Sequence, residues 1–396
     1  MKDSILQLRR TAVELVPSHP ASRAQSAVRS PQSFPTPVPD LLQMLRRSYI
    51  SSVFLITSLA CGDGNAVPVV KDPGGNGATP SPAPVGPLSQ LPPNELGRIP
   101  ILEYHLFGDT ELRWQRETSR FRRDLELLYG RGYRPVSASD LVDGELDLPA
   151  GTSPIVFTFD DASPSQFRYI ETNGALVVDS TSAIGIWMDF AKSHPGWSNK
   201  ATFCLLSGAE AGRSFFGNKD IEGQRTEWRF RKVKWLAEQG FELCNHTLWH
   251  ANLGKYDDAF VQEQIARGVL AIDSVIPGYR VRTFALPLGI WPKNRALASR
   301  GEWRDPKSGR VVTYDFDAVL RVAGDPVPSP TDPAFDAKAL ERVQVTGEDL
   351  ERVLDRLDRS GTRYVSDGIS ETRNEGAMAL RRTPTKPVAP ATPVGF

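Results

Sequence analysis

Residues 154–161 of this chain read PIVFTFDD, an apolar run that ends abruptly in two carboxylates. The run has no polar alternation and a β-branched bias, which is typical of a strand buried on both faces of a parallel sheet. The carboxyl ends of such strands are where active sites collect. We therefore expect Asp160 and Asp161 to lie in a functional site; the alternative is that they only cap the end of the strand.

A second stretch, NHTLWH, places His246 and His250 four positions apart. Imidazoles at this spacing lie on one face of a helical turn, so both can reach one metal ion. A carboxylate from a neighbouring strand end would complete a set of three protein ligands. Three ligands leave positions open for water, as in catalytic rather than structural zinc sites. The alternative is that both histidines serve only in packing or at the surface.

TFDD followed by NHTLWH resembles the signatures of the polysaccharide deacetylases, the NodB-homology or carbohydrate esterase family 4 enzymes, namely TFDDG and an HS/HT-x-x-H pair. The resemblance covers residues 98–367. It implies a distorted (β/α)7 barrel and a hydrolase that removes acetyl groups from an N-acetylated glycan. It also implies that Asp161, His246 and His250 hold a divalent metal, zinc before cobalt or nickel, and that Asp160 is the catalytic base.

The chain departs from the family in the group that would protonate the leaving amine. Many members carry a late L-x-H motif, but no histidine follows His250, and the late strand reads RVQVT over residues 342–346. His105, in ILEYH, resembles the early YH of the deacetylases of exported poly-N-acetylglucosamine, a branch that includes lipoproteins. That resemblance implies that His105 is the acid; the alternative is a packing or loop role.

A second departure lies in residues 285–289, ALPLG, where the family often has an arginine followed by Pro-Tyr. In the family the residue after the proline contributes its backbone N–H to the oxyanion. Leu288 can still do so, because a main-chain donor does not depend on the side chain. The side chain that orients Asp160 is left open; Arg282 is the nearest arginine before this motif.

Strand and helix patterns alternate over about 270 residues, which predicts a closed or nearly closed βα barrel. Residues 162–198 interrupt the alternation as an insertion with a helix near residues 182–192. Insertions after strands lie over the mouth of a barrel, so this one is expected either to shape the substrate groove or to be a solvated elaboration. The expected strands lie at 99–105, 133–137, 154–159, 201–206, 241–245, 283–287, 317–322 and 363–367, and the expected helices at 118–130, 226–239, 257–276 and 348–359.

Composition limits the possible domain organisation and function of the chain. The chain has 396 residues, 40% of them hydrophobic, and no net charge, which fits one large domain with appendages and gives no support to nucleic-acid binding. Three cysteines are too few for a disulfide scaffold. We expect Cys204 and Cys244 to be buried free thiols, because directly paired strands seldom offer disulfide geometry.

Trp249 and Trp291 either stack on sugar rings or pack in the core.

The ends of the chain are expected to lie outside the barrel, which we assign to residues 98–370. Residues 1–43 are rich in Pro, Ser, Arg and Gln, so we expect disorder there, with translation beginning at Met44. Residues 61–97 are rich in Pro and Gly and are expected to be a tether; the alternative is a disordered leader without a spacing role. Residues 371–396 are expected to be a disordered Pro-rich tail.

Residues 44–60 have a basic start and an apolar run far shorter than the ~20 residues that span a bilayer, which fits a secretory signal. The ending Leu59-Ala60-Cys61 resembles a bacterial lipobox, which implies a lipid on Cys61 and a membrane-anchored lipoprotein of the cell envelope. Gly62 favours the outer membrane. The alternative is an uncleaved anchor or an apolar segment without a targeting role.

Two functions remain from the sequence. The first is the metal-dependent deacetylase, with the polymer and the choice between amide and ester left open. The second is a glycan-binding barrel that has lost efficient catalysis, which the missing late histidine and the altered Pro-Tyr motif suggest.

Overall fold

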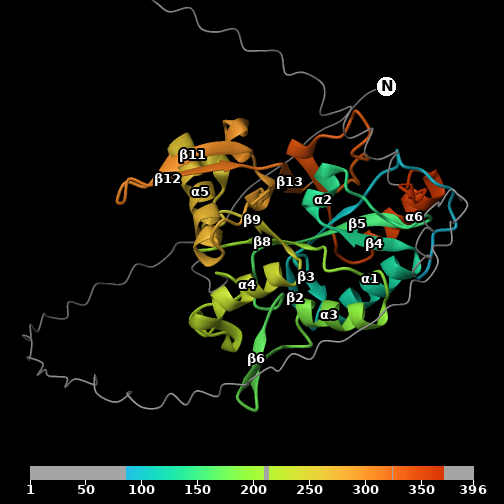
Figure 1. Ribbon diagram of the computed structural model, residues 1–396, viewed down its shortest axis with the longest axis horizontal. Coiled ribbons are helices and arrows are strands. Elements are labelled where there is room, and N and C mark those ends of the chain that lie inside the picture. The colour runs from blue at the N-terminus through green and yellow to red at the C-terminus, as the bar shows by residue number, and fades with distance from the viewer. Residues whose placement is uncertain (1–85, 209–213, 323, 370–396) are drawn as a thin grey trace, which may run out of the picture. The chain divides into compact units, whose positions relative to one another are not determined.

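A closed ring of seven parallel strands lies at the centre of the computed structural model, which describes residues 86–208, 214–322 and 324–369 (Figure 1). The expected distorted (β/α)7 barrel is confirmed. In order around the ring the strands are β1 (Ile101–Tyr104), β14 (Leu340–Gln344), β13 (Ala318–Val322), β10 (Thr283–Ala285), β9 (Glu242–Asn245), β8 (Thr202–Leu205) and β5 (Ser153–Phe159), which pairs with β1 and closes it.

An eighth strand explains the distortion. β4 (Tyr133–Val136) pairs with the first half of β5, as far as Val156, whereas β8 pairs with the second half, from Thr158. β1 pairs with β5 over residues 156–159 and occupies its other edge. β4 and β8 therefore share one edge of β5, one after the other, and the ring is irregular where they meet.

Side-chain alternation along the strands divides the core into two parts. Inward-facing residues fill the barrel, and the helix α2 (Ala138–Asp143) packs with them. Outward-facing residues pack against the surrounding helices in a cluster rich in aromatic side chains. The inward set includes Ile101, Val156, Cys204, Cys244, Leu320 and Leu340, and the outward set includes Leu102, Phe157, Phe203, Leu243, Val319 and Val343.

The helices surround the strands (Figure 1). The helix predicted from residue 118 is confirmed as α1 (Thr118–Gly130). α5 (Asp258–Val275) begins after Asp257, whose side chain accepts a hydrogen bond from the Phe260 N–H, as an N-cap should. α6 (Asp349–Ser360) ends at Gly361 in the left-handed conformation. The remaining long helices are α3 (Ala183–Ser193) and α4 (Arg229–Glu238).

Two sequence predictions need correction. The strand expected at 363–367 is absent, because Arg363 and Val365 form only single bridges, with Arg98 and Asn94. β14 takes its place in the ring. The helix expected over 226–239 is divided into a 3₁₀ turn, Thr226–Trp228, and α4.

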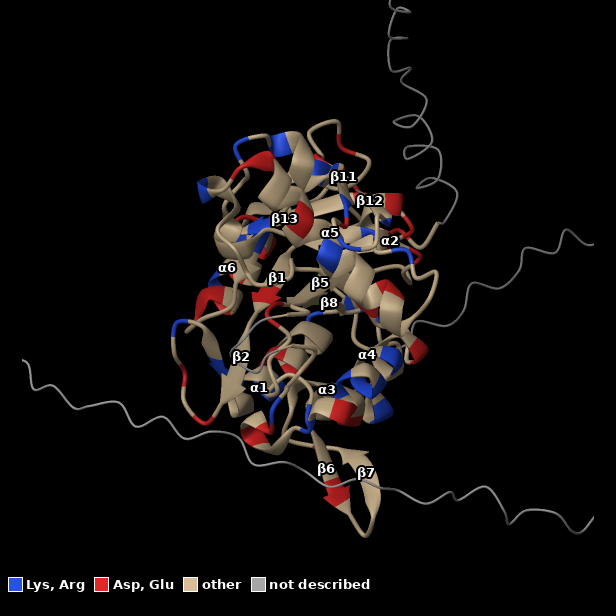
Figure 2. Ribbon diagram, turned by 90° about the vertical axis from the view of Figure 1, so that its left-hand side faces the viewer, with Lys and Arg blue, Asp and Glu red and all other residues tan. Residues whose placement is uncertain are grey.

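The insertion carries a hairpin of β6 (Tyr169–Thr172) and β7 (Ala175–Val178), which projects from the body of the domain (Figure 2), followed by α3. α3 packs beside α1, on the outside of the barrel. The predicted helix of the insertion is therefore confirmed. The other short strands are the parallel pair β2 (Leu106–Gly108) and β3 (Gln115–Glu117) and the hairpin of β11 (Arg300–Arg304) and β12 (Val311–Asp315), which packs on α5.

The end of the predicted tether contacts the barrel. The Ser89 N–H donates to the Gly151 carbonyl, and Asn94 and Val365 form a bridge. The leader, the signal segment with Cys61, the rest of the tether and the C-terminal tail lie outside the described residues. Among the helices that the structure describes, none combines the length and apolarity needed to cross a bilayer.

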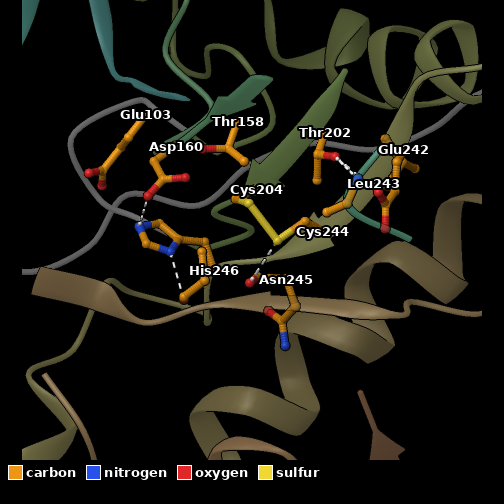
Figure 3. The surroundings of a disulfide bond; sticks show 12 residues. Glu103, Thr158, Asp160, Thr202, Cys204, Glu242, Leu243, Cys244, Asn245 and His246 are labelled. Atoms are coloured by element: carbon orange, nitrogen blue, oxygen red, sulfur yellow. Dashed lines mark hydrogen bonds and ion pairs between the residues drawn. A yellow bond between two sulfur atoms is a disulfide. The ribbon is translucent and has the colours of Figure 1, made fainter. Parts of the chain in front are cut away.

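The prediction of free thiols at Cys204 and Cys244 was wrong, because the two residues form a disulfide (Figure 3). They lie directly opposite each other in the β8–β9 register, with their Cα atoms 4.2 Å apart. Both side chains point into the barrel. The bond therefore links two neighbouring strands one residue before Asn245 and two before His246.

We predict that iodoacetamide labels Cys204 and Cys244 in the denatured chain only after reduction. Because the bond closes a loop of 40 residues, replacing both cysteines with alanine should lower the free energy of unfolding by roughly 2–4 kcal/mol. Peptide mass spectrometry and urea titration provide the two measurements. Labelling of both residues without reductant would contradict the structure.

Candidate active site

Polar side chains form a layer above the apolar filling, at the carboxyl ends of the strands. The alternation that points Ile101 into the barrel also points Glu103 inward, and the alternation of Leu340 does the same for Arg342. Glu103, which accepts a hydrogen bond from Arg342, lines a cavity of about 560 Å³. Its walls are Glu103, His105, Leu106, Arg113, Trp114, Asp160, Asp161, His246, His250, Leu286, Leu288, Val322 and Gln344.

Asp160 and Asp161 reach the same cavity by different routes. Asp160 continues the inward alternation of β5 and is 1% exposed. Asp161 would point outward in an extended strand, but its φ of 75°, followed by a φ of 47° at Ala162, turns the backbone. The left-handed turn brings the second carboxylate back to the cavity.

The structure brings His246 and His250 to Asp161, although not through a helical turn. The segment after β9 is irregular, and Thr247 and His250 have φ values of 70° and 62°. The prediction of a helical turn was therefore wrong, while the convergence of the side chains is confirmed. Nε2 of each histidine lies 3.5 Å from Oδ1 of Asp161.

The donor set fits a divalent metal. Nδ1 of His246 lies 2.9 Å from the Ala285 carbonyl, and donation to that oxygen leaves the lone pair on Nε2. This Nε2 is buried without a hydrogen-bond partner among the described residues. One ligand atom from each of Asp161, His246 and His250 lies within 4.8 Å of the others. These residues are therefore arranged to bind an ion with three protein ligands.

The protonation states suit this role. Burial alone would raise the pKa of Asp161, but the nearby imidazole of His246 holds it below its usual range. Burial, together with the charge of His246, lowers the pKa of His250 to about 4. Near neutral pH Asp161 is ionised and His250 is neutral, as metal ligands must be. Burial would lower the pKa of His246, but Asp160 and Asp161 raise it, so a metal ion must displace a proton from that ring.

Arg342 is the functional residue that the sequence analysis missed. Its guanidinium is buried and holds Asp160 by two parallel hydrogen bonds of 2.8 Å, Nη1 to Oδ1 and Nη2 to Oδ2. Nη1 also donates to Thr158. Burial would raise the pKa of Asp160, but the charge and hydrogen bonds of Arg342 outweigh it and hold the pKa below its usual range.

Arg282, the arginine nearest the altered motif, does not reach the cavity. Its guanidinium pairs with Asp143 and Asp317 instead. The signal for Arg342 was present in the late strand, since period-two alternation from Leu340 places it inside the barrel.

His105 and Leu288 both line the cavity, as predicted. His105 lies beside Glu103, with its Nε2 3.8 Å from Oε1, and packs edge-on against Trp114. Leu288 has a φ of 59°, and its N–H donates to no described residue. The sequence-predicted catalytic residues are thus brought together, and their chemical roles remain predictions.

The expected contributors to a sugar-binding surface do not line this cavity. Trp291 packs on the core, and Trp249 is half exposed beside Phe260. No residue of the insertion 162–198 lies among the described lining residues. Trp114, which sequence reasoning did not single out, forms part of the wall.

Comparison with known proteins agrees with the motifs. The sequence profile of the family described as polysaccharide deacetylase matches residues 198–301. The resemblance to the polysaccharide deacetylases is confirmed. The matched segment contains His246, His250 and Leu288, whereas Asp160, Asp161 and Arg342 lie outside it. A search of curated proteins finds no match.

Solved structures similar to the chain include three deacetylases. The Streptococcus pyogenes deacetylase PplD in complex with acetate is 16% identical, with a TM-score of 0.45 over 65% of this chain and 97% of that chain. IcaB from Ammonifex degensii is 18% identical, with a TM-score of 0.43 over 65% and 96%. BC0361, a polysaccharide deacetylase from Bacillus cereus, is 15% identical, with a TM-score of 0.44 over 63% and 65%.

We predict that His250→Gln weakens zinc binding by at least about 100-fold, because even the loss of an outer partner of a metal ligand costs about 10–100-fold. Calorimetric titration of the metal-free chain with zinc measures the change. The matched control is His194→Gln, since His194 stacks on Phe190 within the insertion. Equal affinities for His250→Gln and the unaltered chain would contradict the assignment.

We predict that Arg342→Met lowers the free energy of unfolding by about 3–5 kcal/mol, because it leaves the buried Asp160 charge uncompensated. Arg321→Met is the control. Arg321 forms only a partly exposed pair with Glu341, 3.9 Å apart, so its loss should cost less than about 1 kcal/mol. Urea unfolding monitored by circular dichroism compares them, and equal destabilisation would refute the structural role of Arg342.

Proposed function

We propose that the protein is a metal-dependent hydrolase that removes acetyl groups from an N-acetylated polysaccharide of the N-acetylglucosamine type. The proposal rests on the different surroundings of two carboxylates that are adjacent in the sequence. Asp161 faces two imidazoles, whereas Asp160 is held by Arg342 within the same cavity. One carboxylate is thereby available for a metal and the other for proton transfer.

Asp161, His246 and His250 would hold the ion, with zinc expected first and cobalt or nickel as alternatives. A bound divalent ion supplies a polarised carbonyl and a water far more acidic than bulk water. Asp160 is ionised and buried at the same cavity, so it accepts the proton of the attacking water. Arg342 fixes the plane of its carboxylate, which limits the directions from which that proton can arrive.

Two further groups serve the later steps. The backbone N–H of Leu288, which donates to no described residue, would donate to the developing oxyanion, a role that preorganised main-chain donors perform well. His105 donates a proton to the departing amine. Trp114, about 41% exposed on the cavity wall, offers an aromatic face to a sugar ring.

The site of action is part of the proposal. We infer from the sequence of residues 44–60 that the chain is exported, and from Cys61 that it is lipid-anchored at the bacterial cell envelope, with Gly62 favouring the outer membrane. The Pro- and Gly-rich residues that follow would then separate the barrel from the membrane surface. The acetylated glycan is the one partner that these features imply besides the membrane.

Acetate release from N-acetylglucosamine oligomers tests the function. We predict release by the zinc-loaded protein, loss on chelation and recovery when zinc or cobalt is restored. Asp160→Asn should reduce the rate by about 10²–10⁴-fold, the usual contribution of a general base. Asp143→Asn is the control, since Asp143 pairs with Arg282 away from the cavity.

The same assay decides between the enzyme and a glycan-binding barrel. Oligomer binding without acetate release, identical in the zinc-loaded protein and in Asp160→Asn, would refute the hydrolase and favour the binding protein.

A further inference from the structure

Glu103 is a buried carboxylate in the wall of the cavity. The proposed deacetylation gives it no role. It lies on β1, two residues before His105, and both side chains line the cavity. Its exposed fraction is 1%. A carboxylate is rarely buried so completely unless its partners require it.

The two oxygens of Glu103 have different surroundings. Oε1 accepts a hydrogen bond of 2.8 Å from Nη2 of Arg342, the same atom that donates to Asp160. Oε1 also lies 3.8 Å from Nε2 of His105. Oε2 is buried and has no hydrogen-bond partner among the described residues. Oε1 is thus bonded to Arg342 and faces the imidazole of His105, while Oε2 of the same carboxylate has unused acceptor capacity.

Arg342 cannot neutralise both of its carboxylates. Asp160 takes two of its hydrogen bonds and Glu103 takes one, so the three groups carry a net negative charge when both acids are ionised. A single proton on the neighbouring imidazole or on Glu103 would relieve this excess. A second cation at this position is disfavoured by the guanidinium, although Glu103, His105 and Asp160 lie within 4.8 Å of one another.

We propose that Glu103 and His105 form a dyad that holds one proton between them, and that Glu103 acts on the leaving group through His105. When the carbon–nitrogen bond of the tetrahedral intermediate breaks, its electron pair goes to nitrogen and the proton of the dyad passes to that nitrogen. Glu103 is left ionised and His105 neutral. The transfer of the proton to the leaving nitrogen rests on the proposed function, whereas the existence of the dyad does not.

The proton affinities of the two groups are consistent with sharing. Burial raises the pKa of Glu103 to about 7, and burial lowers the pKa of His105 from its usual value near 6.5, an effect that Asp160 and Asp161 oppose. Groups this close titrate as a pair. The charged or titratable groups that act on His105 from the surrounding elements are Glu103, Asp160, Asp161, His246 and Arg342.

The test is an NMR titration of the histidine rings in the zinc-loaded full-length chain, in which only five histidines need assignment. Glu103→Gln removes the charge and keeps an oxygen for Arg342. It should lower the pKa of His105 by about 1–3 pH units, the effect of losing an opposite charge at this distance. Glu242→Gln is the control, because Glu242 is a buried glutamate that hydrogen-bonds Thr202. It should leave His105 unchanged.

The pH profile of acetate release gives a second readout. Because the acid must carry its proton, activity falls at high pH, and Glu103→Gln should move that fall to lower pH by the same amount as the NMR shift. An unchanged His105 titration in Glu103→Gln overturns the dyad. If the wild-type chain releases no acetate, the proposed function fails and the NMR result still decides the dyad.

A third measurement avoids dependence on the folding of a variant. In the wild-type chain, the ¹³C signal of the Glu103 carboxyl should titrate in two steps that coincide with those of His105. Independent single steps at unrelated pH values would refute the shared proton.

Discussion

The buried guanidinium of Arg342 makes the hydrogen bonds on which the arrangement of the cavity depends. It binds both oxygens of Asp160 and one oxygen of Glu103, and it also bonds Thr158. Buried charges are tolerated only when they are paired and their hydrogen bonds are satisfied. Arg342 therefore permits two carboxylates to remain inside the barrel, above the apolar side chains of Ile101, Val156 and Leu340 on the same strands.

This constraint explains how two adjacent aspartates acquire different chemistry. Asp160 follows the strand inward and reaches Arg342, whereas Asp161 reaches the histidines only because the backbone turns through a positive φ. Without that turn, Asp161 would point toward the helices, away from His246. Backbone strain of this kind is concentrated at functional sites, where the surrounding structure enforces it. The positive φ at Thr247, His250 and Leu288 follows the same pattern.

Much of this arrangement was predictable from the sequence. The apolar run of β5 ending in two carboxylates located the cavity, and the NHTLWH stretch located the two imidazoles that face Asp161. The barrel followed from the alternation of strands and helices. These features are local, so a short stretch of sequence carries each of them.

The missed features depend on contacts between distant segments. Arg342 is 182 residues from Asp160, and no local pattern pairs them. The Cys204–Cys244 bond depends on the register between β8 and β9, which composition does not reveal. The convergence of the histidines depends on positive φ values in the loop rather than on a helical period. In each case, only the three-dimensional arrangement of the ring and its loops determined which side chains are neighbours.

The ring also accounts for the departures from the family motifs. Where the altered Pro-Tyr motif lacks an arginine, Arg342 reaches Asp160 from β14. Where the late histidine is missing, His105 reaches the cavity from β1, beside Glu103. The strands that bear Arg342 and His105 are neighbours in the ring, because β1 pairs with β14. The polar groups on that side of the cavity therefore come from β1 and β14, the first and last strands of the ring, which pair with each other.

Anomalous diffraction from crystals grown with cobalt tests directly whether Asp161, His246 and His250 bind one divalent ion beside a separately held Asp160. We expect a peak within coordinating distance of one oxygen of Asp161 and of Nε2 of both histidines, with Asp160 still bound to Arg342. A peak held by other residues, or no peak at this site in crystals that contain cobalt elsewhere, would contradict this expectation.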